Sequence, residues 1–235
     1  MNKGIYIALS GAVLRQLQMD IISQNLANAD TTGYKRDKVS FNDYLVPRDL
    51  ASPEPEFKAM SYHSPLITDF SEGNLVKTNN TFDIAIEGKG FIALEGDRYT
   101  RRGDLKRDKD GYLTTYNGIK VMGDKGPIRL PEGAVEISPS GSISVNKVEV
   151  DVIKIVDFTN NQSLSKAGES IFLSTEQAVK ANGEVKQGYL ETSNVSVIKE
   201  MVTMIQALRE YETYQKAIQT FDEAAAKINN EMGRL

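Results

Sequence analysis

The chain has 235 residues, of which 40% are apolar and 26% charged, with a net charge of −4 and no cysteine. This length allows one large domain or two ordinary ones. The acidic balance, without a basic stripe interleaved with aromatic residues, argues against a nucleic-acid binder. The missing cysteines exclude disulfides, thiolate catalysis and cysteine metal sites.

The first 29 residues predict an amphipathic helix that starts near Asn2 and ends near 28–30. Its apolar seam alternates spacings of three and four, which is typical of helices packed as in a coiled coil. The seam residues are Ile5, Ala8, Ala12, Arg15, Met19, Ile22, Leu26 and Ala29, and Leu9, Leu14, Leu17 and Ile21 broaden the apolar surface. A helix that is apolar on more than one side is expected to meet more than one neighbour.

The same stretch superficially resembles a signal peptide, with a charged start and a short apolar run. Its helical spacing continues without a break to Ala29, however, which favours a helix of the mature protein. No stretch is expected to reach the ~18 to 20 apolar residues of a membrane span.

Residues 34–75 predict an extended arm, continued by residues 183–194. Prolines at four positions prevent a long helix, namely Pro47, Pro53, Pro55 and Pro65. Apolar side chains that could anchor the arm are Phe41, Tyr44, Leu45, Phe57 and Tyr62. The single histidine, His63, also lies here, and a lone histidine on the surface is the expectation.

From residue 82 the apolar period changes to two, which predicts strands. Turn signals recur up to residue 183, including Asp110-Gly111 and Asn117-Gly118, where glycine or asparagine accepts a positive φ. Residues 76–182 are therefore expected to form an all-β domain, either a barrel or a sandwich.

A second long helix is predicted from about Val195 to Met232, roughly 55 Å at ~1.5 Å per residue. Its seam candidates are Ile198, Met201, Ile205, Leu208, Tyr211, Ile218, Ala225 and Met232. Gln215, Asp222 and Asn229 fall at the same spacing. Two interpretations stay open. The seam assigned here is shifted by one residue and these polar side chains face water, or they lie within the seam and specify how the helices pair.

The expected fold class is thus α+β. A discontinuous, coiled-coil-like helical domain (1–33 and 195–235) flanks a connecting arm (34–75 and 183–194) and a central all-β domain (76–182). Two apolar helices at the ends of one chain are expected to pack against each other, within a subunit, between subunits, or both. This arrangement is typical of a building block of an assembly.

Motifs for catalysis are weak. Residues 104–111 resemble part of a calcium loop. With Asp110-Gly111 at loop positions five and six, however, the first position is Lys106 and the twelfth is Asn117, where a bidentate Glu is needed. Neither a phosphate loop nor a nucleophile elbow occurs in the sequence. We assign no catalytic, cofactor-binding or metal residue and no small-molecule substrate. A two-carboxylate, carbohydrate-active enzyme is the alternative from another class, and a cell-surface or phage-tail-like structural protein is a third reading.

Three stretches in order resemble the bacterial flagellar rod and hook proteins. They are Ser23 to Lys35 (SQNLANADTTGYK), the central region from Gly73 to Leu113 with FDIAIEGKGF and YTRRG, and the stretch from Gly188 to Glu212 with GYLETSNV and REYE. Together they span nearly the whole chain. The resemblance identifies the chain as a basal-body rod protein of the proximal or distal group, related to the hook protein.

The resemblance implies a structural subunit without enzymatic activity that supports motility. Such subunits leave the cell through the flagellum's own type III export apparatus without a cleaved signal peptide. In the periplasmic basal body they stack helically, with copies of themselves and other axial rod and hook proteins, into the shaft that transmits torque from motor to hook. The short chain, without a longer insertion before Gly188, favours the proximal rod, with the distal rod or the hook as alternatives.

The residues expected to pack subunits together lie at both ends of the chain. They are Ile5, Ala12, Met19, Ile22, Leu26, Asn28, Gly33, Tyr34, Asn194, Val195, Ile198, Met201, Ile205, Leu208, Tyr211 and Ile218.

Overall fold

The computed structural model describes residues 2–39, 66–181 and 183–232, with side chains from residue 4 to residue 227. Its described residues form two compact units. The helical unit contains 2–27, 37–39, 66–67 and 196–232, and the β unit contains 28–36 and 68–195 without residue 182. His63 and the five expected anchors of the arm, Phe41, Tyr44, Leu45, Phe57 and Tyr62, lie outside the described residues.

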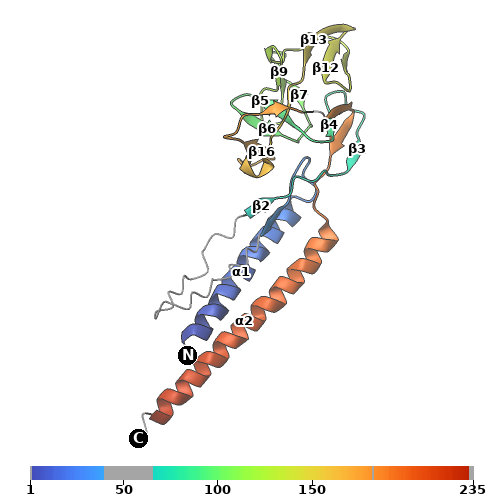
Figure 1. Cartoon of the computed structure of the whole chain (residues 1–235). Helices are drawn as coiled ribbons and strands as arrows, with labels where there is room; N and C mark the ends of the chain where they lie inside the picture. The colour runs from blue at the N-terminus through green and yellow to red at the C-terminus, as the bar shows by residue number, and fades with distance from the viewer. Residues whose placement is uncertain (1, 40–65, 182, 233–235) are drawn as a thin grey trace. The chain divides into compact units, whose positions relative to one another are not determined.

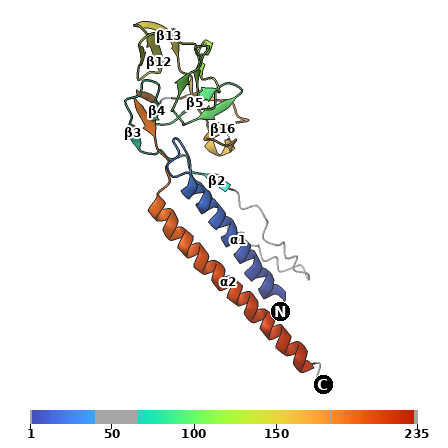
Figure 2. The same ribbon diagram turned by 180° about the vertical axis from the view of Figure 1, so that it is seen from behind.

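Two long helices, α1 (Asn2–Ala27) and α2 (Val197–Met232), run antiparallel in the helical unit (Figures 1 and 2). Near the start of α1, a Cβ on Gly4 would lie 2.8 Å from the ring of Phe221. One turn before the middle of α1, a Cβ on Gly11 would lie 2.5 Å from the ring of Tyr214. The two glycines therefore leave room for aromatic rings of α2.

An ion pair continues the same contact line, because Arg15 Nε lies 2.5 Å from Glu210 Oε2. Side chains buried in the helical unit include Ala8, Ala12, Ile21, Ile22 and Asn25 of α1 and Glu200 and Ala207 of α2. The described part of α1 thus buries three of its predicted seam residues, Ala8, Ala12 and Ile22.

By length and composition, Gly4–Ala27 could cross a membrane. The expectation that no stretch reaches this apolar length was therefore wrong for α1. A core helix or a signal sequence meets the same two criteria, so they do not by themselves establish a membrane span.

A short sheet of β1 (Asp37–Val39) and β2 (Leu66–Thr68) follows α1 in the chain. The buried side chain of Asn25 holds the start of β1 through two hydrogen bonds. Its Nδ2 donates to the carbonyl oxygen of Asp37 at 2.8 Å, and its Oδ1 accepts from the Asp37 N–H at 3.0 Å. Asn25 therefore satisfies both the donor and the acceptor of the Asp37 backbone.

The β unit is built from short antiparallel strands, as the turn signals predicted. They are β3 (Leu75–Lys77), β4 (Ile84–Glu87), β5 (Phe91–Leu94), β6 (Arg98–Thr100), β7 (Lys106–Arg107), β8 (Leu113–Thr114), β9 (Met122–Gly123), β10 (Gly126–Pro127), β11 (Val135–Ile137), β12 (Ser142–Val145), β13 (Val148–Val152), β14 (Ile155–Asp157), β15 (Ser165–Lys166), β16 (Ile171–Leu173), β17 (Val179–Lys180), β18 (Glu184–Gln187) and β19 (Tyr189–Glu191). A 3₁₀ turn covers Asn161–Ser163.

The largest sheet of the β unit has the strand order β15-β16-β6-β5-β14-β17, and a meander of β11-β12-β13 forms a second sheet. Strand β4 pairs with β18, and β3 pairs with β19, so that the end of the unit returns to its beginning. One apolar core lies between these sheets and includes Ile84, Leu113, Ile128 and Ile143. A second core is aromatic, with Phe91, Tyr99, Phe158 and Phe172. The α+β class is thus confirmed at this level: a helix at each end and a strand-rich centre.

Candidate subunit interface

Helix α1 carries a row of exposed apolar side chains on one side. We call Tyr6, Leu9, Val13 and Leu17 the α1 patch; Tyr6 is 67% exposed. Tyr6, Val13 and Leu17 each lie two residues beyond a residue that contacts α2, namely Gly4, Gly11 and Arg15. Two residues turn a helix by about 200°. The α1 patch therefore faces away from α2.

Helix α2 carries a corresponding row over its first three turns. We call Ile198, Met201, Val202, Ile205 and Leu208 the α2 patch; Ile198 is 78% exposed. Leu208 lies two residues before Glu210, which pairs with Arg15 of α1, and Met201 and Ile205 each lie nine residues, or two and a half turns, before Glu210 and Tyr214. By the same geometry, the α2 patch faces away from α1.

Large apolar side chains gathered on one face usually mark a surface that another molecule covers. Covering such area is favourable by roughly 25 cal/mol per Å². The two patches are therefore the candidate packing surfaces of the helical unit.

The structure places the predicted packing residues in three environments. Ala12, Ile22, Gly33 and Tyr34 are buried. Ile5, Met19, Leu26, Asn28, Asn194, Val195, Tyr211 and Ile218 are partly buried. Ile198, Met201, Ile205 and Leu208 are exposed and belong to the α2 patch. Contact of these residues with another subunit stays a prediction.

Sequence reasoning did not single out Tyr6, Val13 or Val202 of the two patches. It also missed the buried Ala207 and the rings of Tyr214 and Phe221, which contact α1. The polar residues at seam spacing, Gln215 and Asp222, are exposed, which agrees with the interpretation that they face water. The side chain of Asn229 lies outside the described residues.

The first and third signature stretches meet in the β unit. The Gly33 N–H donates to the carbonyl oxygen of Glu191 at 2.8 Å, and the Arg36 N–H donates to Asn194 Oδ1 at 2.8 Å. Gly33 has a φ of +65°, and a Cβ there would lie 2.6 Å from the backbone of Arg101. This close approach, in a left-handed conformation, explains why the position needs glycine.

A buried charge cluster lies beside this junction. The carboxylate of Glu191 accepts from Lys35 Nζ at 2.5 Å, from the Gly73 N–H at 2.9 Å and from Arg101 at 3.3 Å. Lys35 Nζ also donates to the carbonyl oxygen of Ser71 at 2.7 Å. Burial lowers the pKa of Lys35 below its ordinary value, and the nearby Glu191 opposes that shift.

Arg101 links this cluster to the start of the sheet system. Its guanidinium donates to the carbonyl oxygens of Ile86 at 3.1 Å and Gly88 at 2.6 Å, and it lies 5.5 Å from the ring centre of Phe91. Among the described residues, its Nε has no hydrogen-bond acceptor. We name Lys35, Arg101 and Glu191 the junction cluster; sequence reasoning missed it as a site.

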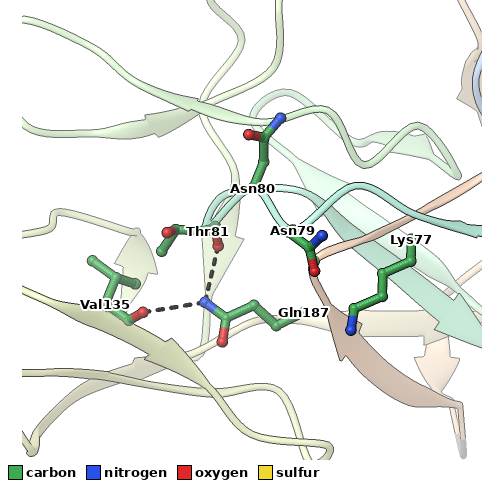
Figure 3. A pocket seen from close by; sticks show the side chains of 7 residues that line it. Lys77, Asn79, Asn80, Thr81, Val135 and Gln187 are labelled. Atoms are coloured by element: carbon green, nitrogen blue, oxygen red, sulfur yellow. Dashed lines mark hydrogen bonds between the residues drawn. The ribbon is translucent and has the colours of Figure 1, made fainter.

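A polar hollow of about 300 Å³ lies elsewhere on the β unit (Figure 3). It is lined by Lys77, Asn79, Asn80, Thr81, Val135, Gln187 and Gly188. The Gln187 amide donates to the carbonyl oxygens of Thr81 at 2.9 Å and Val135 at 3.1 Å, and its oxygen accepts from the Ile137 N–H at 3.0 Å. The Gln187 amide thus connects Thr81 to Val135 and Ile137, and its nitrogen and oxygen are both used in these hydrogen bonds.

Residues 104–111 fold as strand β7 followed by a turn. Asp108 Oδ1 accepts from the N–H groups of Asp110 at 3.0 Å and Tyr112 at 2.7 Å, and Arg102 pairs with Asp104 at 2.6 Å. In the described part of the chain, no group of three metal-binding side chains comes together.

Three known families match successive parts of the chain. Residues 5–35 match the flagella basal body rod protein family, residues 85–145 the flagellar hook protein FlgE/F/G D1 domain, and residues 186–231 the flagellar basal body rod FlgEFG protein C-terminal family.

Whole-chain similarity extends to curated proteins from several bacteria. The flagellar basal-body rod protein FlgG of Buchnera aphidicola subsp. Baizongia pistaciae is 32% identical over 261 residues, covering 97% of this chain and 99% of the relative. FlgG of Borreliella burgdorferi is 33% identical over 264 residues, covering 98% of each. The flagellar basal-body rod protein FlgF of Caulobacter vibrioides is 28% identical over 252 residues, covering 100% of each.

Proposed function

Because this chain belongs to the flagellar basal-body rod family, and is a structural subunit of that rod, we propose that its paired terminal helices form the surface through which subunits pack. Members of this family are structural axial proteins rather than enzymes, so the carbohydrate-active alternative is dropped. The rod serves motility, and the chain acts in the flagellar basal body.

The observation that carries the proposal is the pair of exposed apolar patches on α1 and α2. In the assembled rod, copies of this chain and other axial rod or hook proteins cover these patches. The helices then pack side by side in a coiled-coil manner, with the 1–33 and 195–235 segments as the assembly domain. Shear along such a seam must displace many interlocked side chains at once, which suits a shaft that transmits torque. The β domain extends beyond residues 76–182, because β18 and β19, which were expected in the connecting arm, pair with β4 and β3.

The proximal segment of the rod is the position we propose for the chain. The alignments with the two FlgG proteins extend over 261 and 264 positions, more than the 235 residues present here, so those relatives contain segments that this chain lacks. A chain shorter than these FlgG alignments supports this placement. Cross-linking in purified basal bodies would test it by showing which axial proteins lie above and below; contacts only with the hook would contradict it.

The chain is proposed to reach the periplasm through the flagellar export apparatus with its N-terminus intact. Gly4 and Gly11 accommodate Phe221 and Tyr214 of α2. Removal of a leader within α1 would delete these contacts, which supports export without cleavage. Mass spectrometry of the rod-bound protein should find residues 2–20; a mature N-terminus inside α1 would contradict the proposal.

Leu26→Asp tests the packing function. Leu26 is half-buried in the last turn of α1, and a carboxylate there should oppose helix packing because a buried charge without a partner is strongly unfavourable. We expect the variant to be absent from purified basal bodies while its β unit stays folded by near-UV circular dichroism. Ser23→Asp, at an exposed position of the same helix, is the matched control and should assemble normally. Normal rods made from Leu26→Asp would refute the assignment of Leu26 to the packing seam.

A further inference from the structure

We propose that the α1 patch of one subunit packs on the α2 patch of the next copy of this chain, displaced along the helices by about 10 residues, or ~16 Å at ~1.5 Å per residue. The inference rests on the proposed packing function and specifies its partner, polarity and stagger. It is argued from the position of the two patches within the helical unit.

The patches point in opposite directions. Each faces away from the partner helix, because its residues lie about half a turn from those in the α1–α2 contact. One face of the helix pair is therefore the α1 patch and the opposite face is the α2 patch. A copy placed beside the α2 patch can present its own α1 patch to it, and this contact can repeat.

The patches also lie at different heights along the pair. Gly4 lies at Phe221, Gly11 at Tyr214 and Arg15 at Glu210, so each step forward in α1 matches one step back in α2. By this correspondence, the α1 patch (6–17) lies beside α2 residues 208–219. The α2 patch spans 198–208. The two centres are therefore separated by about 10 residues.

Polar residues limit each patch and so fix the displacement. On the outer face of α2, exposed Arg209, Glu212 and Gln215 follow Leu208. On α1, exposed Asp20 and Ser23 follow Leu17. Without a displacement, the α1 patch would meet the polar part of the neighbouring α2, and burying those groups is unfavourable. With the displacement, two apolar rows of similar length meet.

Direction and charge agree with this contact. In an assembly whose subunits share one orientation, a neighbour's α1 runs antiparallel to α2, as it does within the subunit. Asp20, beyond one end of the α1 patch, then comes to the same end as Lys199, beside Ile198, so opposite charges lie near each other. Because two different surfaces pair and each copy is displaced along the helices, the contact cannot close into a ring and generates an open helical array.

The cysteine-free chain allows a direct test by disulfide cross-linking. Val13 and Val202 occupy matching heights in the displaced contact, whereas within one chain they face opposite directions. We expect Val13→Cys/Val202→Cys in purified, oxidised basal bodies to give a ladder of dimers, trimers and longer species on non-reducing gels, with loss of the monomer band. Leu9→Cys/Ile205→Cys probes the same contact independently, in case the first pair prevents assembly.

Controls distinguish the alternatives. Each single-cysteine variant should stay monomeric on the gel, because like residues do not meet. Val13→Cys/Gln219→Cys, which places the second cysteine on the polar half of α2, should give no ladder. Dimers of either single variant, or incorporated chains in which neither designed pair cross-links, would overturn the proposal. If the wild-type chain itself were absent from basal bodies, the proposed function would fail, and this inference with it.

Discussion

Lys35 Nζ lies 2.5 Å from Glu191 Oε1, although 156 residues separate them in the sequence, and the exposed fractions of their side chains are 1% and 0%. The pair joins the first residues of the β unit to its last strand, β19. Arg101 adds a second positive charge on the other carboxylate oxygen. The junction cluster therefore holds together the two places where the chain enters and leaves the β unit.

Glu191→Ala should lower the free energy of unfolding of the β unit by about 3–5 kcal/mol, because it leaves two buried cations without their counter-charge. Lys35→Met should cost less, since Glu191 keeps Arg101 and the Gly73 N–H as partners. Urea titration of the full chain, followed by tyrosine near-UV circular dichroism, measures both. The exposed pair of Lys186 and Glu87, 2.6 Å apart, is the control, and Lys186→Met should have little effect. Equal small losses for all three variants would contradict a structural role of the cluster.

The stability contribution of Lys35 should depend on pH in a defined direction. Burial, the largest cause, lowers the pKa of Lys35 below its ordinary 10.5. Between the lowered pKa and 10.5, the folded chain binds fewer protons than the unfolded chain, so the free energy of unfolding rises with pH. Below that window the penalty for burying the ammonium is fully present, and above it the penalty is gone.

Lys35→Met has no such group, so wild type should gain stability relative to this variant as the pH approaches 10.5 from below. Urea titrations of both proteins at several alkaline pH values measure the difference. A difference that shrinks over this window would show that ion pairing with Glu191, rather than burial, dominates the pKa of Lys35.

Gly33→Ala should destabilise the β unit by about 3 kcal/mol or more, because a Cβ collides with backbone in addition to the left-handed φ. Gly118 is the matched control: its φ is +82°, but nothing lies within 4 Å of a Cβ built on it. Gly118→Ala should therefore cost only the conformational term, about 1–2 kcal/mol. Similar losses for both variants in urea titrations would argue against the close packing of Gly33 on Arg101.

Amide hydrogen exchange should separate the two units in dilute protein. The α1 and α2 patches have no partner in a single chain, and ordering the backbone costs ~1–2 kcal/mol per residue. We expect residues 5–28 to exchange faster than β5 in the β unit's core, and to become protected on assembly. Strong protection of 5–28 in the monomer would contradict ordering on assembly.

Local patterns predicted the elements that depend on local physics. Alternate spacings of three and four located α1 and α2 to within a few residues, and the period of two with glycine turns located the strands. On α1 the seam containing Ala8, Ala12 and Ile22 is buried. On α2, two stripes compete: the large residues of the α2 patch, and Ala207, Tyr214 and Phe221 on the side of α1. Periodicity alone cannot decide which stripe meets the chain's own partner.

The junction cluster was out of reach of such patterns for a different reason. Lys35, Arg101 and Glu191 come from three distant segments, and each is an ordinary charged residue in its own neighbourhood. Burial of a charge depends on which segments pack around it, and this is settled only by the tertiary fold. The signature stretches that contain Lys35 and Glu191 marked the right regions, but not the contact between them.

The adjoining ends of the β unit have a consequence for how such a chain can change. Gly33 and Arg36, in its first segment, donate hydrogen bonds to Glu191 and Asn194 near its C-terminal end. The first and last segments of the unit are therefore adjacent. The turn Asn146-Lys147 between β12 and β13 is bonded instead to Ala134 and Glu132, so it can be lengthened or trimmed without altering where the backbone enters and leaves the β unit. Relatives can thus diverge in the size of their β unit while the two terminal helices stay unchanged.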